Sequence, residues 1–547
     1  MVLKVPRSLL TLIAATAIFL PACFPQSQSD SDAPNRPQEI VSVKVVPFTL
    51  PVLVGNDASP LLKLKIETTG QLNPISLTEL KAKLDGPADG LEISSLHVCH
   101  GDTNGGFSSG CRSHETKVLA ESPNTTGADY LFSCPQNACE LTAGTNIIWI
   151  AGRPSKDANI DHRIGVVCKE VTFSNGKSVT LDAATSIQRT GVALRNGGVD
   201  GVHTYRIPGL ETTNQGTLIG VYDVRRRSGR DLPGDIDVGM SRSTDGGRTW
   251  QPMQIIMNMG DDPQWQYDGI GDPAVLVDRN TGTVWVAATW SHGNRSWVGS
   301  GPGLKPEETG QLILVRSEDD GVTWSEPINI TEQIKRPEWS FLLQGPGKGI
   351  TMRDGTLVFA AQHQDPPERQ RLPHATIIYS KDHGNTWKIG TGAFDDTTEA
   401  QVVEVEPGVL MLNCRYNRKP MRVVMTTRDM GATWQKHASS EISLIEPDGC
   451  MASLIDVDQE TGQDTGGWLL FSNPDSTSGR HHITIKASSD RGLTWPEENR
   501  LLLDEGNGSG YSCLSMIDDK TIGILYEGSQ AQLTFQRIPL SDLVGRR

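Results

Sequence analysis

The sequence has no excess of positive charge. Its 547 residues contain 50 lysines and arginines and 65 aspartates and glutamates, which gives a formal net charge of −15 at pH 7. This balance argues against nucleic acid as a partner and against a broad electrostatic attachment to anionic membranes. The length exceeds that of one ordinary core and predicts two domains.

Helical periodicity is also missing, because no long stretch after Gly191 repeats its apolar residues at helical spacing. Short apolar runs bounded by Gly, Asp and Asn take its place, and such runs are typical of β-strands. They cover residues 218–224, 284–288, 312–315, 357–361 and 377–379. The larger, C-terminal part of the chain is therefore predicted to be all-β.

The apolar run near the start, residues 9–20, is too short to span a bilayer but suits the core of a signal peptide. The small residue before Cys23 resembles the cleavage site of a bacterial lipoprotein, with Pro21 as an atypical occupant. We predict a signal peptide over residues 1–23 and a flexible tether over residues 24–38. Lipidation of Cys23 would place the protein in the periplasm or on the cell surface, and ordinary secretion is the alternative.

No pair of histidines lies at zinc-finger spacing from the cysteines, which disfavours a structural zinc site among them. The cysteines of the first half instead suit disulfides in an oxidising, exported setting. Cys99–Cys111 and Cys134–Cys139 are the plausible local bridges, and the spacing alone does not settle the pairing.

One eight-residue pattern occurs five times. It reads Ser/Thr-x-Asp-x-Gly-x-Thr-Trp and ends at Trp250, Trp324, Trp387, Trp434 and Trp495. In such a box the Ser and Asp side chains can hydrogen-bond nearby backbone N–H groups, Gly supplies a positive φ, and Trp packs into the core. We therefore assign its aspartates to architecture and not to chemistry.

Short strands with one such turn per repeat predict a β-propeller, whose radial blades leave only short, protected edges. The five boxes require at least five blades. We predict six, one of them without a box, over residues 189–547. The final strand, residues 532–537, is expected to close the ring against strands near Tyr205.

Residues 39–188 contain no copy of the box, and their strand-like runs predict a small β-sandwich. These runs cover residues 40–46, 62–66, 146–151 and 165–173. Residues 187–191 are the predicted joint between the two domains. The sandwich either binds carbohydrate or packs against the propeller, and we favour packing.

The motif Tyr205-Arg206-Ile207-Pro208 stands just before the first box. Together with the boxes it resembles the sialidase (neuraminidase) family from about Gly191 to the end of the chain. The first half is similar to the sandwich domain that precedes some bacterial sialidase propellers. The resemblance implies an exo-α-sialidase that removes terminal sialic acid from glycoconjugates, without a cofactor and without a metal in the chemistry.

The resemblance also implies three arginines for the carboxylate of the sugar. By motif these are Arg206, Arg415 in Leu-Asn-Cys-Arg and Arg480 in Ser-Gly-Arg. Guanidinium groups suit this task because they can bind a carboxylate with two parallel hydrogen bonds. Glu527 in Leu-Tyr-Glu-Gly matches the family glutamate that keeps the first arginine oriented.

A carboxylate on the anomeric carbon disfavours an anionic nucleophile, and sialidases use tyrosine. Tyr511 in Gly-Tyr-Ser-Cys matches that tyrosine. A free phenol has a pKa near 10 and needs a base beside it. Glu399 in Thr-Thr-Glu-Ala-Gln matches the family glutamate, and Glu404 in the same run is expected to lie away from the substrate.

The leaving group needs a proton, and Asp231 in Asp-Leu-Pro matches the family's acid/base aspartate on a loop beside the pocket. Asp235 and Asp237 are the alternatives. Arg225 and Asp272 also stand in matching motifs and are expected to bind other substituents of the sugar.

Trp290, Trp297 and methionine-lined surfaces are all candidates for contact with the N-acetyl methyl group of the sugar. A trans-sialidase would keep the same residues. A non-catalytic sialic-acid-binding adhesin would usually lack Tyr511, Glu399 or Asp231, all of which are present. An unrelated Asp-box propeller, such as a sorting receptor, would not need the spaced arginines.

Overall fold

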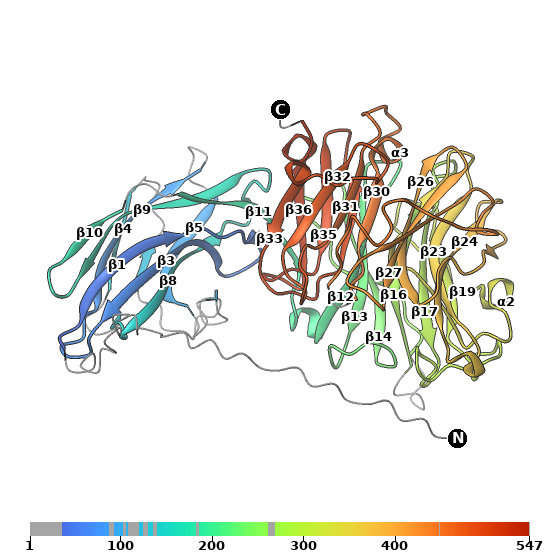
Figure 1. The fold of residues 1–547 in the computed structure, drawn as a ribbon, viewed down its shortest axis with the longest axis horizontal. Helices are drawn as coiled ribbons and strands as arrows, with labels where there is room; N and C mark the ends of the chain where they lie inside the picture. Colours follow the sequence, from blue (N-terminus) through green and yellow to red (C-terminus); the bar gives the residue numbers. More distant parts are fainter. Residues whose placement is uncertain are drawn as a thin grey trace, which may run out of the picture.

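Almost all of the regular secondary structure in the computed structural model consists of β-strands (Figure 1). It describes residues 36–86, 92–101, 106–107, 120–123, 129–134, 139–181, 185–260, 268–447 and 449–545. The predicted signal peptide and Cys23 lie outside these ranges. Within them, no helix is both long and apolar enough to cross a membrane.

The N-terminal unit consists of two facing sheets. One has the order β1 (Glu39–Val46), β3 (Ser59–Thr69), β8 (Gly144–Pro154), β5 (Ile93–His100) and β6 (Ala120–Pro123). The other runs from β11 (Thr185–Arg195) through β9 (Arg163–Phe173) and β4 (Leu77–Asp85) to β7 (Asp129–Ser133), with β10 (Ser178–Thr180) on β9 and β2 (Val52–Val54) on β11. The predicted β-sandwich is confirmed.

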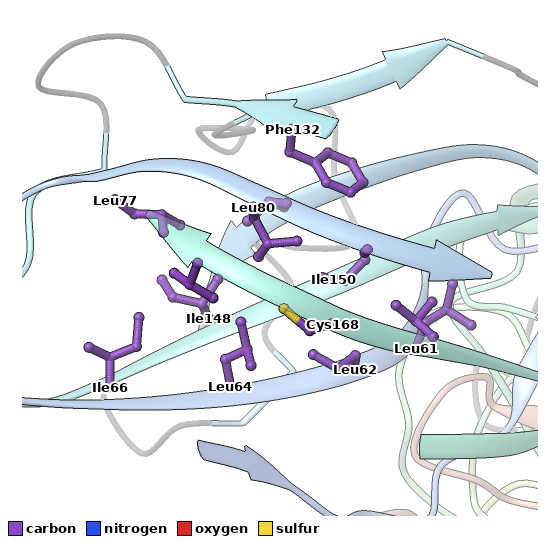
Figure 2. Packing of buried hydrophobic residues seen from close by; sticks show 14 of the residues in the cluster. Leu61, Leu62, Leu64, Ile66, Leu77, Leu80, Phe132, Ile148, Ile150 and Cys168 are labelled. Carbon is purple, nitrogen blue, oxygen red and sulfur yellow. The ribbon is translucent and has the colours of Figure 1, made fainter. Parts of the chain in front are cut away.

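The core of the sandwich lies between these sheets because alternate side chains of each strand point inward. Figure 2 shows β3, β4, β7, β8 and β9 contributing to one apolar cluster. Its labelled members are Leu61, Leu62, Leu64, Ile66, Leu77, Leu80, Phe132, Ile148, Ile150 and Cys168.

The cysteines of this unit include both a disulfide and thiols. Cys99 is disulfide-bonded, and Cys111, the partner that we predict for it, lies outside the described residues. The thiols of Cys134 and Cys139 are in hydrogen-bonding contact, which together with burial raises the pKa of Cys134. The structure therefore does not contain the second predicted bridge.

Six four-stranded units of the described chain form the propeller. The first comprises β12 (Thr204–Thr212), β13 (Leu218–Arg225), β14 (Ile236–Ser243) and β15 (Gln254–Met257). The second comprises β16 (Gly269–Val277), β17 (Val284–Ser291), β18 (Gln311–Ser317) and β19 (Ile328–Asn329), with β21 (Gly347–Lys348) on β16. The third comprises β20 (Phe341–Gln344), β23 (Leu357–Gln364), β24 (Pro373–Ser380) and β25 (Lys388–Ile389), with β22 (Ile350–Thr351) on β23.

The fourth blade comprises β26 (Thr397–Glu406), β27 (Val409–Tyr416), β28 (Val423–Thr427) and β29 (Gln435–Lys436). The fifth comprises β30 (Ser453–Asp456), β31 (Leu469–Pro474), β32 (Ile483–Ser488) and β33 (Arg500–Asp504). The sixth comprises β34 (Ser512–Met516), β35 (Thr521–Tyr526), β36 (Leu533–Pro539) and the end of β11. Two short helices, α2 (Thr331–Ile334) and α3 (Val457–Thr461), lie between strands.

Strand β11 belongs to both units, between which it lies in Figure 1. Its first half, Thr185 to Arg189, pairs with β9 of the sandwich. Its second half, Val192 to Arg195, pairs with β36 of the propeller. The last strand thus closes the ring on β11, the strand that precedes Tyr205, and Tyr205 N donates to Gln532 Oε1 at 2.8 Å.

This closure also explains why one blade has no box. In the first five blades the box connects the third strand to the outer strand. In the sixth blade the third strand is β36 and the outer strand is β11, which lie at opposite ends of the propeller sequence. No turn joins them, so there is no place for a box.

Each box is closed by its own side chains, as the second one shows. Ser317 Oγ donates to Asp319 Oδ1 at 2.8 Å and accepts from Gly321 N at 2.9 Å. Thr323 donates to the Asp319 carboxylate from its N at 2.8 Å and from its Oγ1 at 2.6 Å. The residue before the glycine, Asp320, also has a positive φ of 63°. Sequence analysis predicted this conformation only for the glycine.

Replacing Asp319 by alanine should lower the melting temperature without changing any activity of the folded protein. Hydrogen bonds from Thr323 hold the pKa of Asp319 at about 2, below its ordinary value. A depressed carboxylate pKa stabilises the fold above the unfolded pKa, and this contribution is lost as the pH falls through the folded pKa. The difference in melting temperature between the wild type and Asp319→Ala should therefore be largest at pH 7. It should shrink between about pH 4 and pH 2.

The matched control is Glu318→Ala, which removes an exposed neighbour and should change little. A folded Asp319→Ala protein with wild-type stability but no activity would contradict the architectural role.

Candidate active site

A cavity of about 410 Å³ opens among residues contributed by blades one to four and six. Five of the predicted site residues line it: Asp231, Asp272, Glu399, Arg415 and Tyr511. They come from strand ends and loops that are far apart in sequence. The propeller brings them together because the corresponding ends of its strands meet at one face of the ring.

Tyr511 and Glu399 form the most closely coupled pair in this cavity. Tyr511 Oη donates to Glu399, with Oε1 at 2.8 Å and Oε2 at 2.7 Å. Only 6% of Tyr511 is exposed. Burial, and then the negative charge of Glu399, raises the pKa of the Tyr511 phenol well above its ordinary value. The phenol is therefore neutral and has a carboxylate in place to take its proton.

Arg415, at the end of β27, lies against the same pair. Its Nη1 donates to Glu399 Oε2 at 2.6 Å and to Tyr511 Oη at 3.1 Å. Burial works against the charged form, but the charge of Glu399 outweighs it and the pKa of Arg415 is raised. Its Nε is buried and has no hydrogen-bond partner among the described residues.

Arg206 is oriented by a buried carboxylate. Its Nε and Nη2 donate to the two oxygens of Glu527 at 2.9 and 3.1 Å. The same carboxylate accepts from the backbone N of Ile207 at 2.8 Å and of Tyr511 at 3.0 Å. Ile207 has a φ of 59°, which strains a β-branched residue, so these bonds hold an unfavourable backbone in place.

Arg480 lies on another side of the phenol. Its Nη1 donates to Ser509 O and its Nη2 to Gly449 O, both at 2.8 Å. Its Cζ is 5.3 Å from the centre of the Tyr511 ring, and Arg206 Cζ is 5.0 Å from the same point. All three predicted arginines therefore surround Tyr511.

Asp231 stands on the loop between β13 and β14 and its side chain is 74% exposed. Its Oδ1 lies 2.7 Å from Arg225 Nη2 and 3.6 Å from Arg206 Nη1. The two alternatives to Asp231 form ion pairs outside the cavity. Asp235 pairs with Arg227 at 2.9 Å and Asp237 with Arg226 at 2.6 Å, and neither lines the cavity.

Glu404, in the same strand as Glu399, accepts from Arg353 N at 2.7 Å and Gly408 N at 2.8 Å. It is not among the residues that line the cavity, in agreement with our expectation.

Both units of the chain match known protein families. Residues 227–525, more than half of the chain, match the family model of a BNR repeat-like domain. Residues 40–177 match the N-terminal domain of BNR-repeat neuraminidase. The chain is 45% identical over 523 residues to a sialidase of Bacteroides fragilis (strain YCH46), which covers 90% of this chain and 94% of the relative.

The chain belongs to the sialidase family.

The sialidase assignment agrees with solved structures. Hadza microbial sialidase Hz136 matches with a TM-score of 0.83 and 45% identity, over 91% of this chain and 100% of that one. The intramolecular trans-sialidase from Ruminococcus gnavus in complex with oseltamivir carboxylate is 19% identical, with a TM-score of 0.55 over 65% of this chain and 98% of that one. At that identity it shows the shared fold alone. The protein is thus a glycoside hydrolase of the exo-α-sialidase type, and the adhesin and receptor alternatives are set aside.

Arg225 was expected to bind a substituent of the sugar, but in the sialidase site it lies behind the cavity wall. It is 1% exposed and does not line the cavity. Asp223 accepts from its Nε at 3.0 Å and Nη2 at 2.9 Å, and Gly229 O accepts from its Nη1 at 2.7 Å. Arg225 therefore positions Asp231 and its loop. Sequence analysis missed Asp223, although alternation along β13 puts it on the same face as Arg225.

Asp272 lines the cavity and has a φ of 59°. Its N donates to Asp223 Oδ1 at 2.8 Å. Burial, followed by the charges of Asp223 and Glu399, raises the pKa of Asp272 well above its ordinary value. A protonated Asp272 could donate a hydrogen bond to a sugar hydroxyl.

The structure separates the two candidate tryptophans. Trp297 lines the cavity and packs edge-on against Phe341, with ring centres 5.9 Å apart. Trp290 donates to Asp268 at 3.0 Å and is not in the lining. Ile207, Leu232 and Thr398 also line the cavity, and they stand in motifs of the sequence that assigned them no role. The lining residues outside any motif are Ser296, Phe341, Leu343, Gln362 and Asn417. Only their places in the fold identify them.

Replacing Glu527 by glutamine should destabilise the enzyme. The change leaves Arg206 beside a neutral amide in a buried site, and breaking such a pair typically costs roughly 3 kcal/mol. We expect a loss of that order in the free energy of unfolding, measured by chemical denaturation. The control Asp235→Asn removes one partner of an exposed pair and should cost less than about 1 kcal/mol. Equal losses in the two variants would contradict the central place of Glu527.

Proposed function

We propose that the enzyme is a retaining exo-α-sialidase that works through a covalent sialyl-tyrosine intermediate on Tyr511. The observation that carries this proposal is the contact between Tyr511 Oη and both oxygens of Glu399, at 2.8 and 2.7 Å. A phenol with a raised pKa is a weak nucleophile unless a base takes its proton as it attacks. Glu399 is the only described carboxylate hydrogen-bonded to this phenol.

The sugar carboxylate is bound by Arg206, Arg415 and Arg480. Support comes from their convergence around Tyr511 and from the place of Arg415 in the cavity lining. Arginine–carboxylate contacts would give the site its charge specificity, because local cations outweigh the distant negative charges that solvent ions screen over about 8 Å.

In the first step, Asp231 donates a proton to the glycosidic oxygen while Tyr511 Oη attacks the anomeric carbon. The bond to the leaving alcohol breaks, and the phenolic proton passes to Glu399. In the second step, water attacks the anomeric carbon and Asp231 accepts its proton. Tyr511 leaves and takes its proton back from Glu399, which restores the site. Two displacements retain the anomeric configuration.

The remaining contacts of the sugar follow from the cavity wall. Trp297 and Phe341 form an apolar corner that suits the methyl of an N-acetyl group. Asp272, whose pKa is raised by burial and by the charges of Asp223 and Glu399, faces the same cavity, and its protonated form can donate to a hydroxyl. Sialylated glycans are the substrates that this combination fits.

We further propose that the enzyme is exported and held by a lipid at Cys23. The basic and apolar leader ending at that cysteine supports export. The disulfide at Cys99 is consistent with an oxidising compartment. Radiolabelled palmitate incorporation that is lost in Cys23→Ser tests the anchor, and secretion of unlabelled protein would contradict it.

Tyr511→Phe and Asp231→Asn should differ in the substrates on which they lose activity. Without the phenol no sialyl-enzyme can form, so Tyr511→Phe should lose activity on natural glycans and on aryl sialosides. Asp231→Asn should retain activity on aryl sialosides, whose leaving group needs little protonation. The measurements are kcat/KM on both substrate classes and intact mass after reaction with a fluorinated sialosyl fluoride.

The expected adduct is one sialyl mass on the Tyr511 peptide of the wild type, and none in Tyr511→Phe. An adduct on another residue, or equal loss on both substrate classes in Asp231→Asn, would overturn these roles. Chromatography of the products with and without added lactose distinguishes hydrolysis from sialyl transfer.

Arg415→Ala and masking of the substrate carboxylate as an amide should each weaken inhibitor binding roughly tenfold to a hundredfold, because a hydrogen bond to a charged group contributes about 1.5–3 kcal/mol. Made together, the two changes should cost little more than either alone, since they delete the same interaction. Inhibitor dissociation constants for the four combinations measure this. Fully additive losses would mean that Arg415 does not touch the carboxylate.

A further inference from the structure

A second group of polar side chains lies at the end of the third blade, outside the cavity lining. His363 near the end of β23 is paired in register with His374 on β24, and Asp365 follows β23 directly. One potential ligand atom of each residue lies within 4.8 Å of the others. His363 and Asp365 are buried, and His374 is largely so. The reaction proposed above uses none of the three.

The contact between His374 and Asp365 suits a tetrahedral ion. His374 Nε2 lies 3.2 Å from Asp365 Oδ2. Two ligands each about 2.0–2.1 Å from a tetrahedral zinc ion are separated by about 3.3 Å. The other ring nitrogen, His374 Nδ1, lies 3.3 Å from Asp395 Oδ1. A carboxylate in that place is typical of metal-binding histidines, because it fixes the ring and its tautomer.

His363 is held rigidly but has unused bonding capacity. Its ring stacks on Trp339 with centres 3.8 Å apart and planes 16° apart. Only 5% of the residue is exposed, and its Nδ1 is buried without a hydrogen-bond partner among the described residues. Buried polar nitrogens without a partner are unusual in folded proteins, and a fixed ring of this kind needs little reordering to bind a ligand.

We propose that His363, Asp365 and His374 bind one divalent transition-metal ion of the zinc class. Two imidazoles and one carboxylate are donors that suit zinc and disfavour calcium or magnesium, which prefer sets of oxygen ligands. Water would complete the coordination. This ion is structural and separate from the sialidase chemistry, for which the sequence predicts no metal.

The position of the site gives the ion a consequence for the cavity. The neighbouring Gln362 lines the cavity, whereas alternation along β23 puts His363 on the opposite face. In the hairpin between the ligands, Arg371 donates to Gln364 Oε1 at 2.6 Å and to Trp297 O at 2.5 Å. An ion that ties β23 to β24 therefore steadies the segment that carries Trp297, so its removal should raise KM more than it lowers kcat.

One neighbour opposes the ion. Arg369 Nη1 lies 3.5 Å from Asp365 Oδ2, the oxygen that also faces His374, and its side chain is 73% exposed. Arg369 can move into solvent when the ion binds. Arg369→Ala should therefore tighten metal binding several-fold, whereas loss of the orienting carboxylate in Asp395→Asn should weaken it about tenfold to a hundredfold.

The test uses the whole enzyme, stripped with a chelator and titrated with Zn²⁺ alone. Calorimetry and elemental mass spectrometry should find one ion per chain, and Co²⁺ should give the visible absorption of a tetrahedral site. His363→Gln and His374→Gln should weaken binding at least a hundredfold. The control His162→Gln changes a histidine–carboxylate pair with a 2.8 Å contact to Glu92 and should leave binding unchanged.

The absence of stoichiometric uptake would overturn the proposal, and so would uptake that His374→Gln leaves intact. If the ligand variants fail to fold, Arg369→Ala and Asp395→Asn still test the proposal. Both changes are at exposed side chains, so these variants should fold. Affinity changes in opposite directions support the site, and equal affinities in both variants refute it. The zinc stoichiometry separates this result from the proposed mechanism, since a failed Tyr511 assignment would leave it untouched.

Discussion

The site depends on one buried carboxylate. Glu527 accepts hydrogen bonds from the Arg206 guanidinium and from the backbone N of Ile207 and of Tyr511. Burying a charge is costly unless the charge is paired and its oxygens are fully bonded, and here both conditions hold. Glu527 lies just beyond β35 in the last blade, whereas Arg206 lies on β12 in the first. The same interaction therefore orients an arginine, positions the phenol and joins the two ends of the ring.

Two of the three arginines around Tyr511 are paired with carboxylates. Arg415 is paired with Glu399, and Arg206 with Glu527. In the mechanism that we propose, the substrate carboxylate shares these cations with carboxylates already present. This arrangement avoids the repulsion of unpaired guanidinium groups in a confined space and favours a ligand that approaches from the open side.

Local chemistry made much of this structure predictable. The boxes carry their own hydrogen-bonding groups, so Asp319 and its equivalents could be assigned from eight residues of sequence. The apolar runs likewise marked strands, and family motifs named the residues that meet around Tyr511. Contacts set by register could not be predicted. Strand pairing places Arg225 behind Asp231 and brings His363 beside His374. A short motif does not specify how a strand pairs.

The shared strand β11 also governs the order in which the protein can be completed. The sandwich emerges first during synthesis, and the first half of β11 can pair with β9 at once. Its second half must wait for β36, near the end of the chain. Closing so long a loop is entropically expensive and slow compared with hairpin formation. Until the last blade has left the ribosome the ring stays open, and Glu527 cannot reach Arg206. Activity therefore becomes available only when the whole chain has been made.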